Sequence, residues 1–256
     1  MKLSWRRACL SAGLAVLAAC VPKLLPIEMG SPKWGAEVTW HGHSCFTIRD
    51  SIGRTVVIDP FDETVGYGRL SLRADALLIS HEHFDHDYKR AVLARGRDIE
   101  LVESTGTATV ASGLIVTGIP SYHDNEGGQI NGSNRIYTFV LGGLRFAHLG
   151  DFGEDELSDY EKKMIGHVDV LLIPVGGVVT IDAEKAKRIV DDLQPAFVFP
   201  MHYGNIRFYH LDPVEKFLAL FPLDQVVQLR DSHVRLHLSD FKEKPIVYTL
   251  LPTETN

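Results

Sequence analysis

A stretch of eleven residues constrains this chain more than any other. Residues 76–80 (Ala-Leu-Leu-Ile-Ser) are an apolar run closed by a serine, which predicts a short buried strand. The next six residues carry four potential metal ligands, His81, His83, Asp85 and His86. Neutral imidazoles and a carboxylate suit zinc, and a loop that leaves a rigid strand can bring such ligands together. A solvated polar turn would explain one histidine, but this density favours a metal site.

Three further candidate ligands each follow a segment predicted to be a strand. Asp151 comes after residues 144–149, His202 after 196–200, and His123 after 114–117. Open sheets place their sites at strand ends, so these side chains are candidates to complete the site. Asp151 could bridge two metal ions, although an aspartate at a strand end often only caps a turn.

The order of the other predicted elements indicates strands first and strand–helix pairs later. Strands are expected at residues 37–40, 45–48, 55–58, 100–103, 114–117, 168–174 and 196–200, with a hairpin of 135–141 and 144–148 and final strands at 226–229, 234–238 and 246–250. Helices are expected at residues 87–95, 154–165, 182–193 and 212–221, with Asp182 as the N-cap of the third. This order predicts sheets whose outer faces are covered by helices.

The order and spacing of the candidate ligands resemble the metallo-β-lactamase superfamily over residues 34–205. Residues 39–44 (Thr-Trp-His-Gly-His-Ser) and 200–204 (Pro-Met-His-Tyr-Gly) are similar to the branch of ascorbate-6-phosphate lactonase and N-acyl-phosphatidylethanolamine phospholipase D. The resemblance implies an α/β (α+β) fold, a four-layer αββα sandwich with its metals at one edge between the sheets.

By the same resemblance, two zinc ions are expected. The first would be held by His81, His83 and His123, the second by Asp85, His86 and His202, and Asp151 would bridge them. Asp59 matches an early aspartate of the family that braces the ligand loop, and His43 matches a histidine of this branch that could line the pocket. The remaining histidines have no motif around them and are expected to be surface or interior residues: His41, His148, His167, His210, His233 and His237.

The resemblance implies a hydrolase that attacks its substrate with a metal-bound hydroxide, oriented by Asp85 as the catalytic carboxylate. Di-iron members of the superfamily usually carry Glu where this chain has His83, which favours zinc, and the bridging Asp151 counts against β-lactam hydrolysis. The substrate could be an ester, a lactone or a phosphodiester, and either a small molecule or a lipid. A phospholipase-D-like activity on lipid is one of these alternatives. A non-catalytic zinc-binding lipoprotein is the alternative outside enzymes, and no oligomeric state is predicted.

The first nineteen residues are predicted to be an export signal. Basic residues at positions 2, 6 and 7 precede an apolar core at 8–19, which is shorter than the about 20 residues that span a bilayer. The core ends in Leu-Ala-Ala-Cys20, which resembles the lipobox of bacterial lipoproteins and implies cleavage before Cys20 and its acylation. Val21, rather than Asp, follows and favours the periplasmic face of an outer membrane. An ordinary secretory signal or an uncleaved anchor is the alternative.

Composition then bounds the mature chain. Residues 20–33 contain three prolines and a glycine and are predicted to be a tether, and residues 34–256 are long enough for one hydrolase domain. Cys9 leaves with the signal and Cys20 would be acylated, so Cys45 has no disulfide partner. The net charge of −7 becomes −10 when the three basic residues of the signal are removed, which argues against nucleic acid as a partner.

Overall fold

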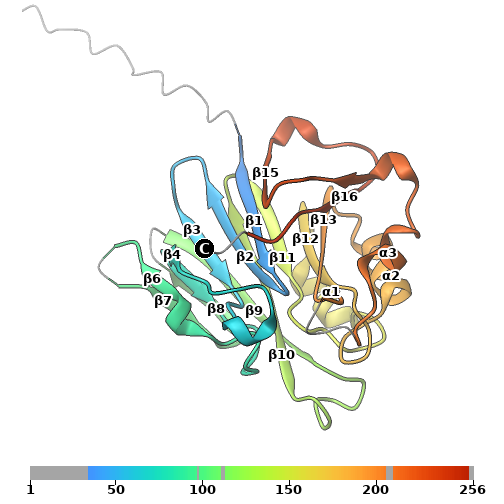
Figure 1. Ribbon diagram of the computed structural model, residues 1–256, viewed down its shortest axis with the longest axis horizontal. Helices are drawn as coiled ribbons and strands as arrows, with labels where there is room; N and C mark the ends of the chain where they lie inside the picture. Colours follow the sequence, from blue (N-terminus) through green and yellow to red (C-terminus); the bar gives the residue numbers. More distant parts are fainter. Residues whose placement is uncertain (1–33, 97, 111–112, 206–209, 254–256) are drawn as a thin grey trace, which may run out of the picture. The chain divides into compact units, whose positions relative to one another are not determined.

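Two β-sheets packed face to face form the core of the described part of the chain (Figure 1). The computed structural model describes residues 34–253 except 97, 111–112 and 206–209, all within the unit Pro32–Asn256. The predicted signal and tether therefore lie outside the described residues. Among the residues described, no helix combines the length and the apolar character that crossing a membrane requires.

The first sheet has six strands in the order β15-β1-β2-β3-β5-β7. Its amino-terminal half is an antiparallel meander, and β3, β5 and β7 are parallel. The strands are β1 (Ala36–Gly42), β2 (Cys45–Asp50), β3 (Thr55–Ile58), β5 (Ala76–Leu78), β7 (Glu100–Val102) and β15 (His233–Leu236).

The second sheet has eight strands in the order β14-β16-β13-β12-β11-β10-β9-β8. Strands β8 to β11 are antiparallel, whereas β11, β12, β13 and β16 run parallel. Its members are β8 (Gly106–Val110), β9 (Leu114–Tyr122), β10 (Ser133–Leu141), β11 (Leu144–His148), β12 (Val170–Pro174), β13 (Phe197–Met201), β14 (Val226–Gln228) and β16 (Ile246–Thr249).

Side chains alternate between the two faces of each strand, and this alternation divides the apolar residues into layers. In β3, Val56 and Ile58 pack between the sheets, whereas Val57 faces the outer side of the first sheet. In β12, Leu172 packs between the sheets and Leu171 faces the helices. A single slip in register would reverse these faces, so the burial pattern specifies the pairing.

Three helices cover the outer face of the second sheet (Figure 1), which together with the sheets confirms the predicted fold class. They are α1 (Asp159–Ile165), α2 (Ala183–Leu193) and α3 (Val214–Leu218). Asp182 caps α2 as predicted, since its side chain accepts a hydrogen bond from the Lys185 backbone N–H. Helix α1 begins later than predicted, because Ser158 and Glu161 form a reciprocal capping box there.

The outer face of the first sheet is covered differently, and the helix predicted over residues 87–95 is wrong. A 3₁₀ turn at Lys89–Ala91 leads into β6 (Val92–Ala94), which pairs in parallel with β4 (Leu72–Ala74). Val92 is buried and Leu93 is 51 % exposed, as alternation along a strand requires. Helix propensity is a weak preference, and pairing with β4 overrides it here.

Contacts between the sheets anchor the loop that follows β5. The buried Tyr137 of β10 donates its hydroxyl hydrogen towards the carbonyls of Ile79 and Val102, at 2.8 and 2.9 Å. Arg135 donates to the Ser80 carbonyl at 3.1 Å. The base of the loop that carries His81 to His86 is therefore held by both sheets.

Candidate metal centre

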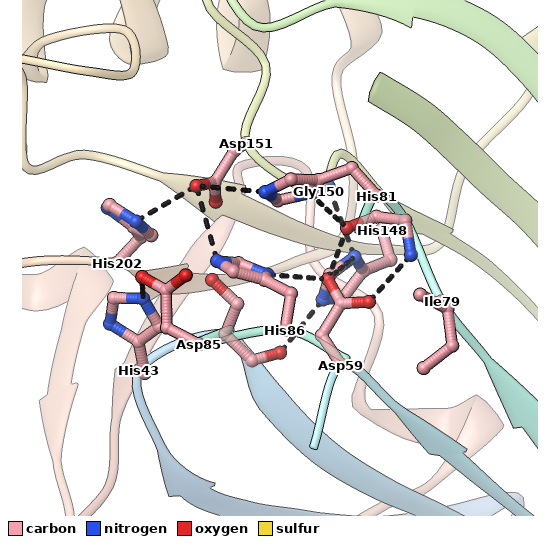
Figure 2. Close-up of polar contacts among 12 residues, drawn as sticks. His43, Asp59, Ile79, His81, Asp85, His86, His148, Gly150, Asp151 and His202 are labelled. Carbon is pink, nitrogen blue, oxygen red and sulfur yellow. Dashed lines mark hydrogen bonds and ion pairs between the residues drawn. The ribbon is translucent and has the colours of Figure 1, made fainter. Parts of the chain in front are cut away.

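Asp151 is the point on which the candidate ligands converge (Figure 2). Its Oδ2 lies 3.0 Å from His202 Nε2, 3.1 Å from His123 Nε2, 3.2 Å from His86 Nε2 and 3.7 Å from His81 Nε2. These residues follow the ends of β11, β13, β9 and β5, four strands drawn from both sheets. Strand ends that meet at one edge thus bring together side chains separated by up to 121 positions in the sequence, His81 and His202 being the extremes.

The donor atoms fall into groups in which all of them lie within 4.8 Å of one another. One group holds His81, His83 and His123, and a second contains His43, Asp85, His86 and His202. A third group, His81, His86 and Asp151, connects the first two. All seven side chains predicted from the sequence lie in these groups, and His43 joins the second predicted set. Their binding of metal stays a prediction.

Asp59, buried beneath the ligand loop, determines how two of the imidazoles are oriented. Its Oδ1 accepts from the Ser80 backbone N–H at 2.7 Å, and its Oδ2 accepts from the Ser80 hydroxyl at 2.6 Å. His86 Nδ1 lies 3.1 Å from the same Oδ2. Because an ionised carboxylate only accepts, His86 carries a proton on Nδ1, and this contact turns its Nε2 towards Asp151.

His81 is oriented through Ser80 in the same way. The Ser80 hydroxyl gives its proton to Asp59, so at the 2.9 Å contact with His81 Nδ1 it can only accept. The Nε2 of His81 is then an unprotonated donor of a lone pair, and burial keeps the ring neutral by lowering the pKa of His81 to about 2. Asp59 therefore orients the Nε2 atoms of both rings towards Asp151, as supporting carboxylates do in metal sites.

These donors fit a metal ion and are poorly matched without one. His81 Nε2, His86 Nε2 and Asp151 Oδ1 are buried and have no hydrogen-bond partner among the described residues. The neutral ring of His81 directs the lone pair of its Nε2 towards the Asp151 carboxylate, and the two repel each other unless a cation lies between them. Two ligands about 2.0–2.1 Å from a tetrahedral zinc are about 3.4 Å apart, close to the 3.0–3.7 Å separating Asp151 Oδ2 from the four imidazoles. Nitrogen and carboxylate donors of this kind suit zinc.

The turn that presents Asp151 is built from residues that sequence reasoning did not single out. The Asp151 backbone N–H donates to Asn134 Oδ1 at 3.0 Å, and Asn134 Nδ2 donates to Ser121 and to the Leu149 carbonyl. The buried His148 accepts from the Gly150 backbone N–H at 3.1 Å, which makes it a satisfied interior histidine as expected. Burial of Asp151 disfavours its charge, yet His202, His86 and His123 outweigh this and hold the pKa of its carboxyl well below the usual range.

Glycines let the ligand segments approach one another closely. A Cβ on Gly176 would lie 2.1 Å from the His202 carbonyl oxygen, and one on Gly153 would lie 2.3 Å from the His123 backbone. Because backbone cannot move aside as a flexible side chain can, these positions require glycine. No motif around either glycine could have shown this.

His43 contributes more to the site than its motif indicated. It is fully buried, its Nε2 lies 3.2 Å from Asp85 Oδ2, and its ring centroid is 4.2 Å from that of His202. Its carbonyl accepts from Trp40 Nε1 and from the His202 backbone N–H, so the β1–β2 turn supports the His202 loop. Burial lowers the pKa of His43 to about 4 and keeps the ring neutral.

A cavity of 310 Å³ opens over the centre. It is lined by candidate ligands together with apolar and amide side chains: His83, Phe84, Asp85, His123, Asn131, Asp151, Val179, His202 and His210. His210, which no motif marked, is therefore placed at the site. The adjoining polar pocket contains Arg135, Glu82 and Asn131.

Comparison with known proteins agrees with this geometry. Residues 37–202 match the family model described as a beta-lactamase superfamily domain, a segment that begins in β1 and ends at His202. A UPF0173 protein of Pyrococcus abyssi is 34 % identical over 185 residues, which are 66 % of this chain and 84 % of the relative. A UPF0173 metal-dependent hydrolase of Thermococcus kodakarensis is 27 % identical over 205 residues, 70 % of this chain and 89 % of the relative.

A solved structure from Thermotoga maritima shares the fold. It is described as a candidate Zn-dependent hydrolase of the metallo-beta-lactamase superfamily, with 32 % identity and a TM-score of 0.68. The match covers 83 % of this chain and 97 % of that one.

Proposed function

This chain belongs to the metallo-β-lactamase superfamily as a metal-dependent hydrolase, and from this premise we propose that it is a dinuclear zinc enzyme that cleaves a carboxylic ester or lactone. The observation that carries the proposal is the convergence of imidazole and carboxylate donors on Asp151 from four strand ends. A structural zinc is usually closed by four protein ligands, whereas seven ligands shared by two ions leave positions open for water and substrate.

The residues divide into two sets of ligands and one bridging carboxylate. His81, His83 and His123 would hold one ion, and Asp85, His86 and His202 the other, with Asp151 between them. When bound, two such ions lower the pKa of a shared water and polarise the group under attack.

Asp85 is proposed to orient the attacking water. Burial disfavours its charge, but the hydrogen bond with His43 and the nearby His86 outweigh burial and hold the pKa of Asp85 well below its usual range. The carboxylate therefore stays ionised at neutral pH and can accept a hydrogen bond from water in the cavity that it lines. His43 Nε2, 3.2 Å away, keeps the carboxylate in this orientation.

A neutral substrate suits the cavity better than an anionic one. Among its described lining residues there is no lysine or arginine, and Phe84 and Val179 give it apolar walls. Arg135 belongs to the adjoining pocket and is hydrogen-bonded to the Ser80 carbonyl. These features favour a carboxylic ester or lactone over a phosphodiester.

Hydrolysis of matched chromogenic substrates tests the proposal. Zinc-loaded protein is assayed with p-nitrophenyl acetate, a lactone and bis(p-nitrophenyl) phosphate, alongside metal analysis of the same sample. We expect two zinc ions per chain and ester or lactone turnover, abolished in Asp85→Asn and His86→Ala and retained in His233→Ala, a change on β15. Turnover of the phosphodiester alone would reject ester or lactone cleavage and identify the protein as a phosphodiesterase. Two bound zinc ions without turnover of any substrate would favour a zinc-binding protein.

We also propose that the domain is exported and attached to a membrane through acylated Cys20. The support is the basic start, the short apolar core and the lipobox-like Leu-Ala-Ala-Cys20. Several acyl chains on one residue give stable anchoring. Labelling cells with a clickable fatty acid should mark the full-length protein and its Cys45→Ser variant but not Cys20→Ser. Equal labelling of both cysteine variants would reject the anchor.

A further inference from the structure

Three exposed apolar residues belong to separate loops that contribute to the lining of the cavity at the metal centre. Phe84 lines the cavity and is 64 % exposed, and Ile130 and Val178 are each 71 % exposed. Ile130 precedes Asn131 and Val178 precedes Val179, and both following residues line the same cavity. Isolated exposed apolar residues are common, but three on loops that line one cavity mark a candidate subsite.

Val178 also has an unfavourable backbone conformation. Its φ is +65°, in the left-handed region that β-branched residues avoid. Of the five non-glycine residues with positive φ in the described part of the chain, His43, Asp59 and His202 belong to the metal centre and Gln194 ends α2. Val178 is the fifth, and no helix end or ligand role accounts for it.

Neither stability nor solubility explains a valine at this position. Glycine or asparagine would fit the backbone, and the exposed side chain of Val178 gains little from burial. The loop itself is fixed, because Gly177 N–H donates to the Ile181 carbonyl and Gly176 contacts the His202 backbone. Strained residues held in place beside a site are commonly there for ligand contact.

We propose that Phe84, Ile130 and Val178 form a subsite for an n-alkyl substituent of the substrate, so that the acyl chain of an ester lies on them while its carbonyl reaches the centre. The cleavage of the ester rests on the proposed function, whereas the binding of the alkyl chain does not. The occupant is argued from the apolar lining residues Phe84 and Val179, and from Ile130 and Val178, which directly precede the lining residues Asn131 and Val179.

Binding of n-alkyl carboxylates tests the subsite without requiring turnover. Acetate, butyrate, hexanoate and octanoate are titrated into the zinc-loaded wild type by calorimetry. Burying a methylene can tighten binding by up to about fourfold, so we expect the affinity to rise measurably with each added methylene, by a factor of up to about four. This gain should fall towards onefold in Val178→Gly and Phe84→Ser. Val178→Gly suits a positive φ, and Val178→Asn is a second variant that tolerates it.

Ile52→Ser is the matched control, since Ile52 is 77 % exposed but lies in the turn after β2, at the opposite end of that strand from His43. It should leave the gain per methylene at the wild-type value. A wild-type affinity that is independent of chain length, or a gain that persists in Val178→Gly and Phe84→Ser, would overturn the subsite. A chain-length dependence that is present in the wild type and lost in these variants supports the subsite, even when no ester is cleaved. Absence of ester cleavage would reject only the proposed hydrolysis.

Discussion

Replacing Asp59 by Asn should weaken metal binding from a position that touches no metal. The carboxylate accepts three hydrogen bonds, two at Oδ2 from the Ser80 hydroxyl and His86 Nδ1 and one at Oδ1 from the Ser80 backbone. An asparagine has one acceptor oxygen, so in either orientation its NH₂ faces a donor. A buried donor left without an acceptor costs about 1–3 kcal/mol of unfolding free energy.

The loss should be larger when zinc is bound. Removing a supporting partner of a ligating histidine typically lowers metal affinity about 10–100-fold, which corresponds to about 1.4–2.7 kcal/mol at saturating zinc. Asp59→Asn should therefore lose about 1–3 kcal/mol with a chelator present and about 1.4–2.7 kcal/mol more in the zinc-loaded protein. Denaturant unfolding in both states, with a zinc titration, measures the two contributions separately.

Asp50→Asn is the matched control for this experiment. Asp50 is also buried, and it accepts from the backbone of Ile52 and from the backbone and side chain of Arg54, at the end of β2 away from the site. It should lose similar stability with and without zinc. The reasoning is refuted if Asp59→Asn binds zinc as tightly as the wild type, or if Asp50→Asn shows the same zinc-dependent loss.

Three further outcomes are expected. Gly176→Ala should lose zinc affinity and about 1–3 kcal/mol of stability, because its Cβ would lie 2.1 Å from the His202 carbonyl oxygen. Gly96→Ala is the control, since its Cβ would meet no described atom within 4 Å, and it should lose neither. Equal stabilities of the two variants by thermal melting would contradict this. Burial, and then the nearby Glu161, raise the pKa of Glu154 from 4.5 to about 7, so between these pH values the folded state holds a proton that the unfolded chain releases. The free energy of unfolding should therefore fall as the pH rises from 4.5 to about 7, and Glu154→Gln should lack this fall. An unchanged pH dependence in Glu154→Gln would argue against this assignment. His43→Ala should reduce hydrolysis more than zinc content, with partial recovery in His43→Gln, whose amide can still donate to Asp85; identical activity of the two variants would exclude the positioning role.

Most of the centre could be predicted because its ligands lie in short local patterns. His81 to His86 form a dense cluster after a recognisable strand, and Asp151 and His202 each follow an apolar run. Strands that end at one edge bring these patterns together, and the resemblance to the superfamily implied their division into two sets. The order of strands and helices predicted sheets covered by helices, and the same resemblance implied the four-layer fold.

Residues that support the centre through long-range contacts could not be predicted. Asn134 lies 17 positions before the Asp151 backbone that it holds, and nothing in its neighbourhood marks it. The segment that became β6 has helix-forming composition, and only the distant strand β4 makes it a strand. The positive φ of Val178 likewise depends on the loop as a whole, because a valine in isolation predicts extended structure.

Anomalous scattering at the zinc edge from crystals of the zinc-loaded protein tests the central claim most directly. The account predicts two peaks per chain, one beside His81, His83 and His123 and one beside Asp85, His86 and His202, with Asp151 between them. A single peak, or peaks that lie away from Asp151, would contradict it.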